Sequence, residues 1–405
     1  MSTSPDALAS LAAEASLSRR QVLSLLGSGG AAAVLAACGR AEDGAAAAEG
    51  GDAAAAIRPW VKDSAPFIQH PTNLETRLER IEGLLTPNDQ FFVRNHTPTP
   101  RIDAATYRLR IEGDGIERPV ELAYEDVLRL PSRSVVAYLE CAGNWRRFFG
   151  EVMGTPASGS QWGTGGVGCA EWTGTPLSSV LDLAGLRRTA VDVNLLGLDE
   201  GEFNRPMSVG KALDDDTILV YAMNGEPLPP DHGFPLRAVV PGWVGSNSVK
   251  WLGRIVVSNE KVWVKNNTTS YVMMGPDWPA DRFAPAEGGP INEQSIKSAL
   301  ALPWPARLEA GERTVRGFAY SPGARVAEVE WSLDGGGTWR PARLADPILQ
   351  HAWARFEIFW NAPAGSHTVT VRAIDELGNT QPPNVPFNEK GYLYNAPLPH
   401  PVRVG

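Results

Sequence analysis

Cys141 is the residue of this chain best suited to chemistry with a metal. It stands in the segment 139–147 (LECAGNWRR), beside a Gly-Asn turn and close to two arginines. Cationic neighbours favour the thiolate form of cysteine, which is the form that binds metals. A free cysteine can also be inert and fill space as a small apolar residue, and Cys141 taken alone favours this second interpretation.

A second polar segment, 91–96 (FFVRNH), places Arg94, Asn95 and His96 in a row. Arginine presents a fixed fork of donors to an oxyanion and stays charged at any working pH. We therefore expect Arg94 to face an anionic ligand. In isolation, a surface arginine beside a capped histidine is the simpler interpretation of such a segment.

Glycine-rich and cationic segments follow. The segment 162–172 (WGTGGVGCAEW) contains glycines that let a backbone approach a ligand closely, and its Cys169 is interpreted as structural or supporting. Further polar and cationic residues occur in three later segments, 221–229 (YAMNGEPLP), 231–237 (DHGFPLR) and 248–252 (SVKWL). The Asn-Gly pair in the first of these is also typical of a hairpin turn, which does not conflict with a site.

Short strands and a few helices would position these segments. Residues 134–139 have the pattern of a strand that ends just before Cys141. Residues 124–130 and 177–184 have helical patterns, and Gly185 is a typical end for the second helix. Thirteen Trp and 33 Pro also favour a protein rich in loops and sheets.

From about residue 300 onward the pattern becomes purely β. Apolar and polar residues alternate in three stretches, 328–333, 356–360 and 369–373. Short alternating strands between Gly and Pro turns favour a sandwich. The sequence therefore predicts an α+β protein, with a mixed α/β domain over 58–299 and an all-β sandwich over 300–405.

The first 57 residues have the composition of an export signal followed by a tether. A twin-arginine pair (SRRQVL) precedes a short apolar run, which is typical of an export signal for folded proteins. The segment LAACG resembles a lipobox, so we expect a signal over 1–38 and a lipid on Cys38; an ordinary cleavage site beside an incidental cysteine is the alternative. Residues 39–57 have little to bury and predict a disordered tether. We expect a periplasmic protein, or one anchored at the outer face of the membrane.

Composition excludes several classes of function. The net charge of −9 argues against a nucleic-acid partner and suits a basic redox partner, while an anionic substrate would need a local cluster of arginines. Three cysteines do not make a disulfide framework. The sequence has no Cys-x-x-Cys-His haem site, no four-cysteine iron–sulfur pattern and no Gly-x-Gly-x-x-Gly loop.

The segments described above, together with 321–326 (SPGARV), resemble five segments of the sulfite oxidase family in the same order. The resemblance covers roughly residues 60–405. It implies a molybdenum–pyranopterin cofactor (molybdopterin), with Cys141 as the metal ligand and no haem in this chain. It implies cofactor contacts by Phe92, Arg94, Asn95, His96, Cys141, Asp199, His232, Arg237, Ser248, Val249 and Lys250. It implies catalytic roles for Arg94, His96, Arg146, Tyr221 and Arg325.

The same resemblance implies oxidation of sulfite to sulfate by oxygen-atom transfer. Electrons would pass to an external acceptor such as a c-type cytochrome, and an immunoglobulin-like C-terminal domain would pair two chains. Arg146 is chosen by its spacing from Cys141, and the adjacent Arg147 is the alternative. In the family pattern Tyr221 would lie beside the metal, and Arg325 would reach into the site from a loop that here lacks two of the family's glycines.

Three other functions stay open at this point. The substrate could be sulfane sulfur or another sulfur compound. The chain could be a reductase of the same superfamily, although such enzymes resemble the central domain alone. It could also be a lipoprotein that keeps the fold as a binding module without a cofactor.

Overall fold

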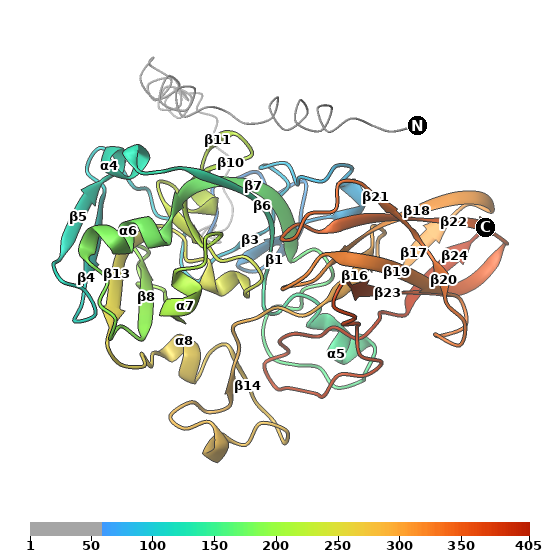
Figure 1. The fold of residues 1–405 in the computed structure, drawn as a ribbon. Helices are drawn as coiled ribbons and strands as arrows, with labels where there is room; N and C mark the ends of the chain where they lie inside the picture. Colours follow the sequence, from blue (N-terminus) through green and yellow to red (C-terminus); the bar gives the residue numbers. More distant parts are fainter. Residues whose placement is uncertain (1–58) are drawn as a thin grey trace, which may run out of the picture.

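The computed structural model describes residues 59–405, which form two strand-rich regions side by side (Figure 1). The predicted export signal, the predicted lipid site at Cys38 and the predicted tether at 39–57 all lie outside the described residues. Over residues 59–405, no helix combines the length and the apolar character needed to span a bilayer.

Two five-stranded sheets build the first region. In one sheet the order is β11-β10-β7-β6, and β12 also pairs with β10. Its strands are β6 (Arg133–Glu140), β7 (Val167–Pro176), β10 (Ile218–Met223), β11 (Glu226–Pro227) and β12 (Arg237–Val239). The other sheet has the order β5-β4-β13-β8-β9. Its strands are β4 (Arg108–Glu112), β5 (Val120–Ala123), β8 (Asp192–Gly197), β9 (Asn204–Ser208) and β13 (Leu252–Ser258).

Few and short helices accompany these sheets. They are α4 (Tyr124–Arg129), α5 (Arg147–Glu151), α6 (Leu177–Ala184), α7 (Val209–Ala212) and α8 (Lys265–Thr268). The predicted helix over 177–184 is confirmed as α6, which buries Leu177, Val180, Leu181 and Ala184 on one stripe and ends at Gly185 with φ 70°. The predicted strand before Cys141 is confirmed as β6, one residue longer at each end.

Smaller elements complete the first region. A three-stranded sheet contains β1 (Ile68–His70), β2 (Asn73–Glu75) and β3 (Val93–Arg94), and a two-stranded sheet contains β14 (Val272–Met273) and β15 (Gly289–Pro290). Single 3₁₀ turns occur at η1 (Leu78–Arg80), η2 (Pro230–His232), η3 (Gly245–Asn247) and η4 (Ala280–Arg282).

The second region consists of two sheets that share an apolar core. One has the order β16-β18-β22-β21, with β16 (Lys297–Leu300), β18 (Gly311–Tyr320), β21 (Arg343–Ala345) and β22 (Ala354–Ala362). The other has the order β17-β24-β23-β19-β20, with β17 (Ala306–Leu308), β19 (Val326–Ser332), β20 (Arg340–Pro341), β23 (Gly365–Asp375) and β24 (His400–Val404). The predicted alternation is present, since Phe356, Ile358 and Trp360 of β22 are buried while their neighbours are not.

The all-β character predicted for the C-terminal part is therefore confirmed, and the protein as a whole is mostly β with few helices. The immunoglobulin-like topology stays a prediction. β16 already belongs to the C-terminal sheet, so hydrogen bonding to β18 begins three residues before the predicted boundary at 300.

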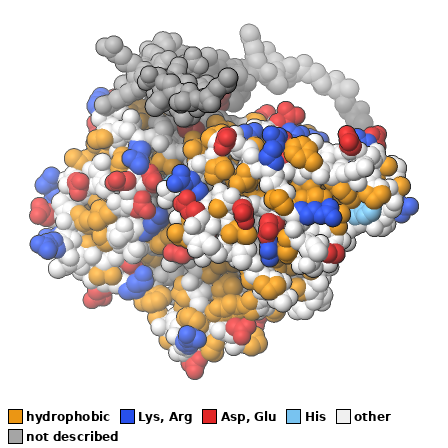
Figure 2. Space-filling view, turned by 45° about the vertical axis from the view of Figure 1, so that its right-hand side comes forward, with side chains coloured by type: hydrophobic (Ala, Val, Ile, Leu, Met, Phe, Trp, Pro, Cys, Tyr) orange, Lys and Arg blue, Asp and Glu red, His pale blue; other side chains and the backbone are white. Residues whose placement is uncertain are grey.

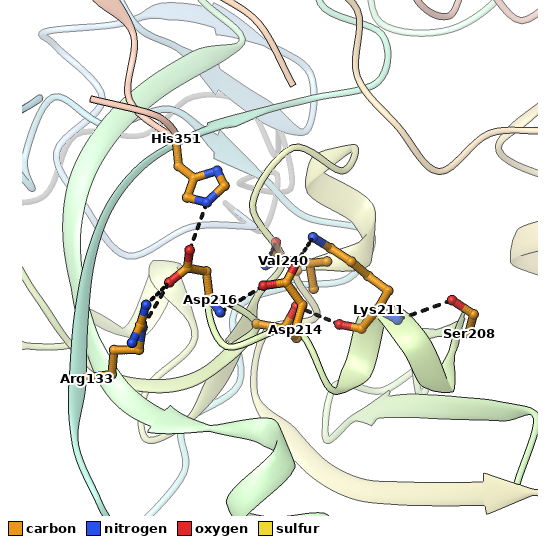
Figure 3. A network of polar contacts seen from close by, with 9 residues as sticks. Arg133, Ser208, Lys211, Asp214, Asp216, Val240 and His351 are labelled. Atoms are coloured by element: carbon orange, nitrogen blue, oxygen red, sulfur yellow. Dashed lines mark hydrogen bonds and ion pairs between the residues drawn. The ribbon is translucent and has the colours of Figure 1, made fainter. Parts of the chain in front are cut away.

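The two regions share buried contacts. Trp353 is fully buried and its Nε1 donates to the carbonyl of Leu84 at 2.7 Å. Figure 3 shows Asp216, just before β10, between Arg133 of the first region and His351 of the second. Its carboxylate oxygens lie 2.6 Å from Arg133 Nη2 and 3.0 Å from His351 Nε2. Acidic and basic side chains are interspersed with apolar ones over the face drawn in Figure 2.

Candidate cofactor pocket and active site

One pocket of the first region brings together all eleven residues predicted to contact a cofactor. They come from separate stretches of chain around positions 92–96, 141, 199, 232–237 and 248–250. The same pocket is also lined by Phe91, Leu139, Ala142, Phe203, Asp231, Gly245, Ser246, Trp251 and Tyr271. The structure thus places these residues together, and their roles toward a ligand stay predictions.

The loop after β6 holds Cys141 at the edge of this pocket, where it is partly exposed. Its backbone N–H donates to the carbonyl of Gly166 at 2.9 Å, and its carbonyl accepts from Asn144 N–H at 2.8 Å. The Asn144 side chain in turn accepts from Gly166 N–H at 2.9 Å, where a Cβ on residue 166 would collide with it. The Gly-Asn turn and the glycine-rich segment therefore hold each other in place through these hydrogen bonds, and together they position the backbone of Cys141.

Cations gather on one side of the pocket. Arg237 donates to the carbonyls of His232 and Ser248 at 3.0 Å each, and Lys250 donates to the carbonyl of Asp231 at 2.9 Å and to Asn95. Burial lowers the pKa of Arg237 to about 9. Burial, followed by the charge of Arg237, lowers the pKa of Lys250 well below its usual value. A bound anion would relieve both effects, because it stabilises the charged forms.

The pocket fits a group that carries a soft metal and a phosphate. The Ser246 Oγ lines it, is buried and has no hydrogen-bond partner among the described residues, so it is free to donate to a ligand. A thiolate suits a soft metal, and ammonium, guanidinium and hydroxyl donors suit a phosphate. Within residues 59–405, no three His, Cys, Asp or Glu side chains converge as a metal site.

His96 and Tyr271 form a pair at the pocket. The Tyr271 hydroxyl lies 2.9 Å from His96 Nε2, and the imidazole stacks on Phe203 with ring centroids 4.2 Å apart. The pocket face of His96 is open to solvent, yet the protein packed around its ring, followed by the charge of Arg94, lowers its pKa well below 6.5. Burial raises the pKa of Tyr271. Both rings are therefore neutral at physiological pH.

Tyr221 does not line the pocket, which corrects the prediction that it lies beside the metal. It belongs to β10, where successive side chains point to opposite faces. Its ring packs with Leu219 in the main apolar core and is only 5% exposed. Tyr271 supplies the pocket's tyrosine instead, and no pattern in the sequence marks it, since it lies in a loop between α8 and β14 with φ 53°.

Arg325 also lies away from the pocket, which corrects its predicted reach into the site. Its exposed side chain pairs with Glu376, with Nε and Oε2 3.2 Å apart. The preceding residues 321–323 line a different cleft, where the carbonyl of Pro322 packs against Gly242. In this loop, which lacks two of the family's glycines, the arginine is thus at the surface.

Arg146 is buried behind the pocket, whereas Arg147 is at the surface with Glu151. Arg146 donates to two backbone carbonyls at 2.8 Å and 2.9 Å, and its guanidinium lies 5.2 Å from the ring of Tyr392. Tyr392 stacks on Tyr271, with ring centroids 5.5 Å apart. Arg146 is therefore the better placed of the two arginines, but it does not line the pocket, and its contact with substrate stays a prediction.

Comparisons with known proteins agree with this geometry. Residues 96–265 match the oxidoreductase molybdopterin-binding domain, and residues 289–397 match the Mo-co oxidoreductase dimerisation domain. The chain is 39% identical to sulfite oxidase from Gallus gallus over 352 residues, which is 81% of this chain and 75% of that protein. It is 37% identical over 349 residues to mitochondrial sulfite oxidase from Mus musculus, of which it spans 63%.

A solved structure of similar fold is the sulfane dehydrogenase SoxCD from Paracoccus pantotrophus. Its TM-score is 0.74 at 28% identity, and the match covers 84% of this chain and 88% of that one. Both domain models match this chain, and its relatives include proteins above 30% identity. One pocket also contains the residues that the resemblance implies for the cofactor. This chain therefore belongs to the sulfite oxidase family of molybdopterin oxidoreductases.

Proposed function

We propose that this protein oxidises sulfite to sulfate with a molybdenum–pyranopterin cofactor. The observation that carries the proposal is the convergence of Cys141, Arg94 and the cations Arg237 and Lys250 on one pocket. Such a pocket offers a thiolate for a soft metal, donors for a phosphate and an arginine for a small oxyanion.

Cys141 would bind the metal, while His232, Arg237, Ser246 and Lys250 would hold the anionic end of the pterin. When bound, the cofactor supplies the oxygen-atom transfer and accepts the two electrons. The chain itself supplies orientation and electrostatics. The cations are already placed by backbone carbonyls, so little reorganisation accompanies binding of an anion.

Arg94 would bind the substrate oxyanion through charge-assisted hydrogen bonds. His96 and Tyr271 stay neutral near physiological pH, so they can orient an oxygen atom without adding a charge that competes with Arg94. Arg146 supports Tyr271 from behind, through the ring of Tyr392. One charge-assisted hydrogen bond to an anion contributes about 1.5–3 kcal/mol, which corresponds to a change of roughly 10- to 150-fold in affinity.

A second candidate substrate is sulfane sulfur, and the similarity to the SoxCD sulfane dehydrogenase favours keeping it. The pocket's arginine would bind sulfite, or a sulfane substrate that carries a negative charge. We propose a c-type cytochrome as the electron acceptor and a homodimer formed through the C-terminal region, which matches a dimerisation domain. We also propose export by the twin-arginine route and attachment of a lipid to Cys38.

Elemental analysis of protein matured in an export-competent host tests the proposal. We expect about one molybdenum per chain, lost in Cys141→Ser and retained in Cys169→Ala, a matched change at a buried cysteine whose pKa burial raises to about 12. Sulfite-dependent reduction of cytochrome c should accompany the metal. Protein without molybdenum would contradict the proposed reaction. Metal with activity on a sulfane substrate and none on sulfite would favour the second candidate.

A further inference from the structure

Residues 59–62 form hydrogen bonds with two residues that line the cofactor pocket. The carbonyl of Pro59 accepts from the Asn95 side chain at 2.8 Å. The backbone N–H groups of Val61 and Lys62 donate to the Asp231 carboxylate at 2.9 Å and 2.7 Å. Asn95 and Asp231 both line the pocket, so these bonds fix the position of Lys62 relative to it.

The Lys62 amine has three acceptors. Its Nζ lies 2.6 Å from the carbonyl oxygen of Asn88, 2.9 Å from that of Phe91 and 2.7 Å from His232 Nε2. An ammonium has three N–H donors and no acceptor. With two of its donors on carbonyls, an ammonium at Lys62 directs the third to His232, and Nε2 is then the unprotonated nitrogen of that ring.

The protonation of His232 follows from this contact. Burial, followed by the charge of Lys62, lowers the pKa of His232 well below 6.5, so the ring is neutral and carries one proton. With Nε2 accepting from Lys62, that proton is on Nδ1. His232 lines the pocket, so a ligand that approached the ring at Nδ1 would meet an N–H donor.

We propose that Lys62 is a positioning residue that holds His232 in the Nδ1–H tautomer and so makes it a hydrogen-bond donor toward the anionic end of the bound pterin. This inference rests on the proposed function, because it assumes that an anion occupies the pocket beside Arg237 and Lys250. Lys62 itself does not line the pocket and acts through His232.

The charge balance around Lys62 agrees with this role. Burial lowers the pKa of its amine to about 7, and the nearby carboxylates of Asp231 and Asp89 oppose that decrease. A neutral amine could instead accept a hydrogen bond from His232 Nε2–H, which would leave Nδ1 as an acceptor that repels a phosphate. A negative charge in the pocket favours the ammonium and thus the donating tautomer.

The tautomer can be read directly by NMR. The chain has six histidines, so long-range ¹H–¹⁵N correlation of the cofactor-loaded, histidine-labelled full chain is tractable, with His232→Gln to assign the signals. At pH 6 we expect an unprotonated Nε2 and a protonated Nδ1 in the native protein. Lys62→Met should give a mixed or reversed tautomer, and Lys62→Arg, which keeps a charged donor, should restore it. Nε2–H in the native protein, or no change in Lys62→Met, would overturn the inference.

Retention of the cofactor gives the second measurement. After transfer into mild denaturant, pterin should leave Lys62→Met about tenfold faster than it leaves the native protein. Lys211→Met is the matched control, since Lys211 pairs with Asp214 at 2.9 Å and does not line this pocket. An unchanged release rate despite an altered tautomer would refute the role toward the cofactor. If the purified protein held no pterin, the proposed function would fail, while the tautomer of apo protein would still decide whether Lys62 sets it.

Discussion

A buried ion pair next to Cys141 joins the two regions, and its removal should be among the most damaging single changes in the protein. Lys297 of β16 and Glu140 of β6 are both fully buried, with Nζ and Oε1 2.6 Å apart. The same carboxylate oxygen accepts from Tyr320 and Asn144 at 2.9 Å each. The other oxygen, Oε2, has no hydrogen-bond partner among the described residues.

Lys297→Met tests this arrangement, because methionine has a similar length and no charge. Removing one partner of a buried pair leaves an uncompensated charge and typically costs about 3–5 kcal/mol. Tyr320 and Asn144 still donate to Glu140 in this variant. We therefore expect a loss of unfolding free energy at the lower end of that range, about 3 kcal/mol. Guanidinium unfolding of the cofactor-loaded protein, followed by far-ultraviolet circular dichroism and tryptophan fluorescence, measures the loss.

A double-mutant cycle gives the decisive comparison. Lys297→Met combined with Glu140→Gln should be less destabilised than Lys297→Met alone, because no charge is then left buried. Glu309→Gln is a matched control in the exposed pair with Arg313, and it should cost less than about 1 kcal/mol. A loss below about 1 kcal/mol for Lys297→Met, or strictly additive effects in the cycle, would refute the reasoning.

Three further predictions concern the site and the response to acid. Arg94→Ala should raise the KM for sulfite roughly 10- to 150-fold with molybdenum content unchanged, whereas Arg325→Ala should leave KM as it is; equal effects would contradict the assigned positions. Tyr271→Phe should lower kcat more than Tyr221→Phe, and steady-state kinetics of both variants decides between them. Burial lowers the pKa of His400 to about 4 from 6.5, so the neutral ring contributes stability above pH 6.5 that is lost as the pH falls toward 4, by about 3 kcal/mol in all. His400→Gln should therefore lose less stability than the native protein over that pH range in denaturant titrations, and an identical loss would argue against this assignment.

Local signals in the sequence were sufficient to predict individual elements, including the strand that leads to Cys141. The strand β6 and the helix α6 both follow from periodicity and a terminating residue, which are properties of neighbouring positions. All but Asp199 of the eleven predicted pocket residues came from family motifs, and motifs keep side chains in register with the backbone that presents them. For this reason Asn95 and Lys250, which are 155 positions apart, meet in one pocket as the resemblance implied.

The errors have a different physical origin. Tyr221 lies within a recognised motif, but alternation along β10 directs neighbouring side chains to opposite faces, and only the sheet's packing decides which face borders the pocket. Tyr271 enters from a loop whose path depends on contacts with His96 and Phe203, far away in the sequence. Arg325 follows its own loop, and the loss of two glycines there removes the backbone freedom that motif transfer assumes.

The position of the ion pair makes the C-terminal region, which matches a dimerisation domain, part of the structure that holds Cys141 in place. Glu140 is the last residue of β6 and directly precedes Cys141, and it is held by Lys297 and Tyr320 from the C-terminal sheet. The Gln294 side chain donates to the carbonyl of Glu140 at 2.7 Å, so the backbone at this point is also held by the segment that leads into β16. A shift of the C-terminal sheet would therefore move the thiol relative to Arg94. Because the pocket's cations are fixed by their own backbone contacts, such a shift should change the metal's environment before it changes binding of the phosphate.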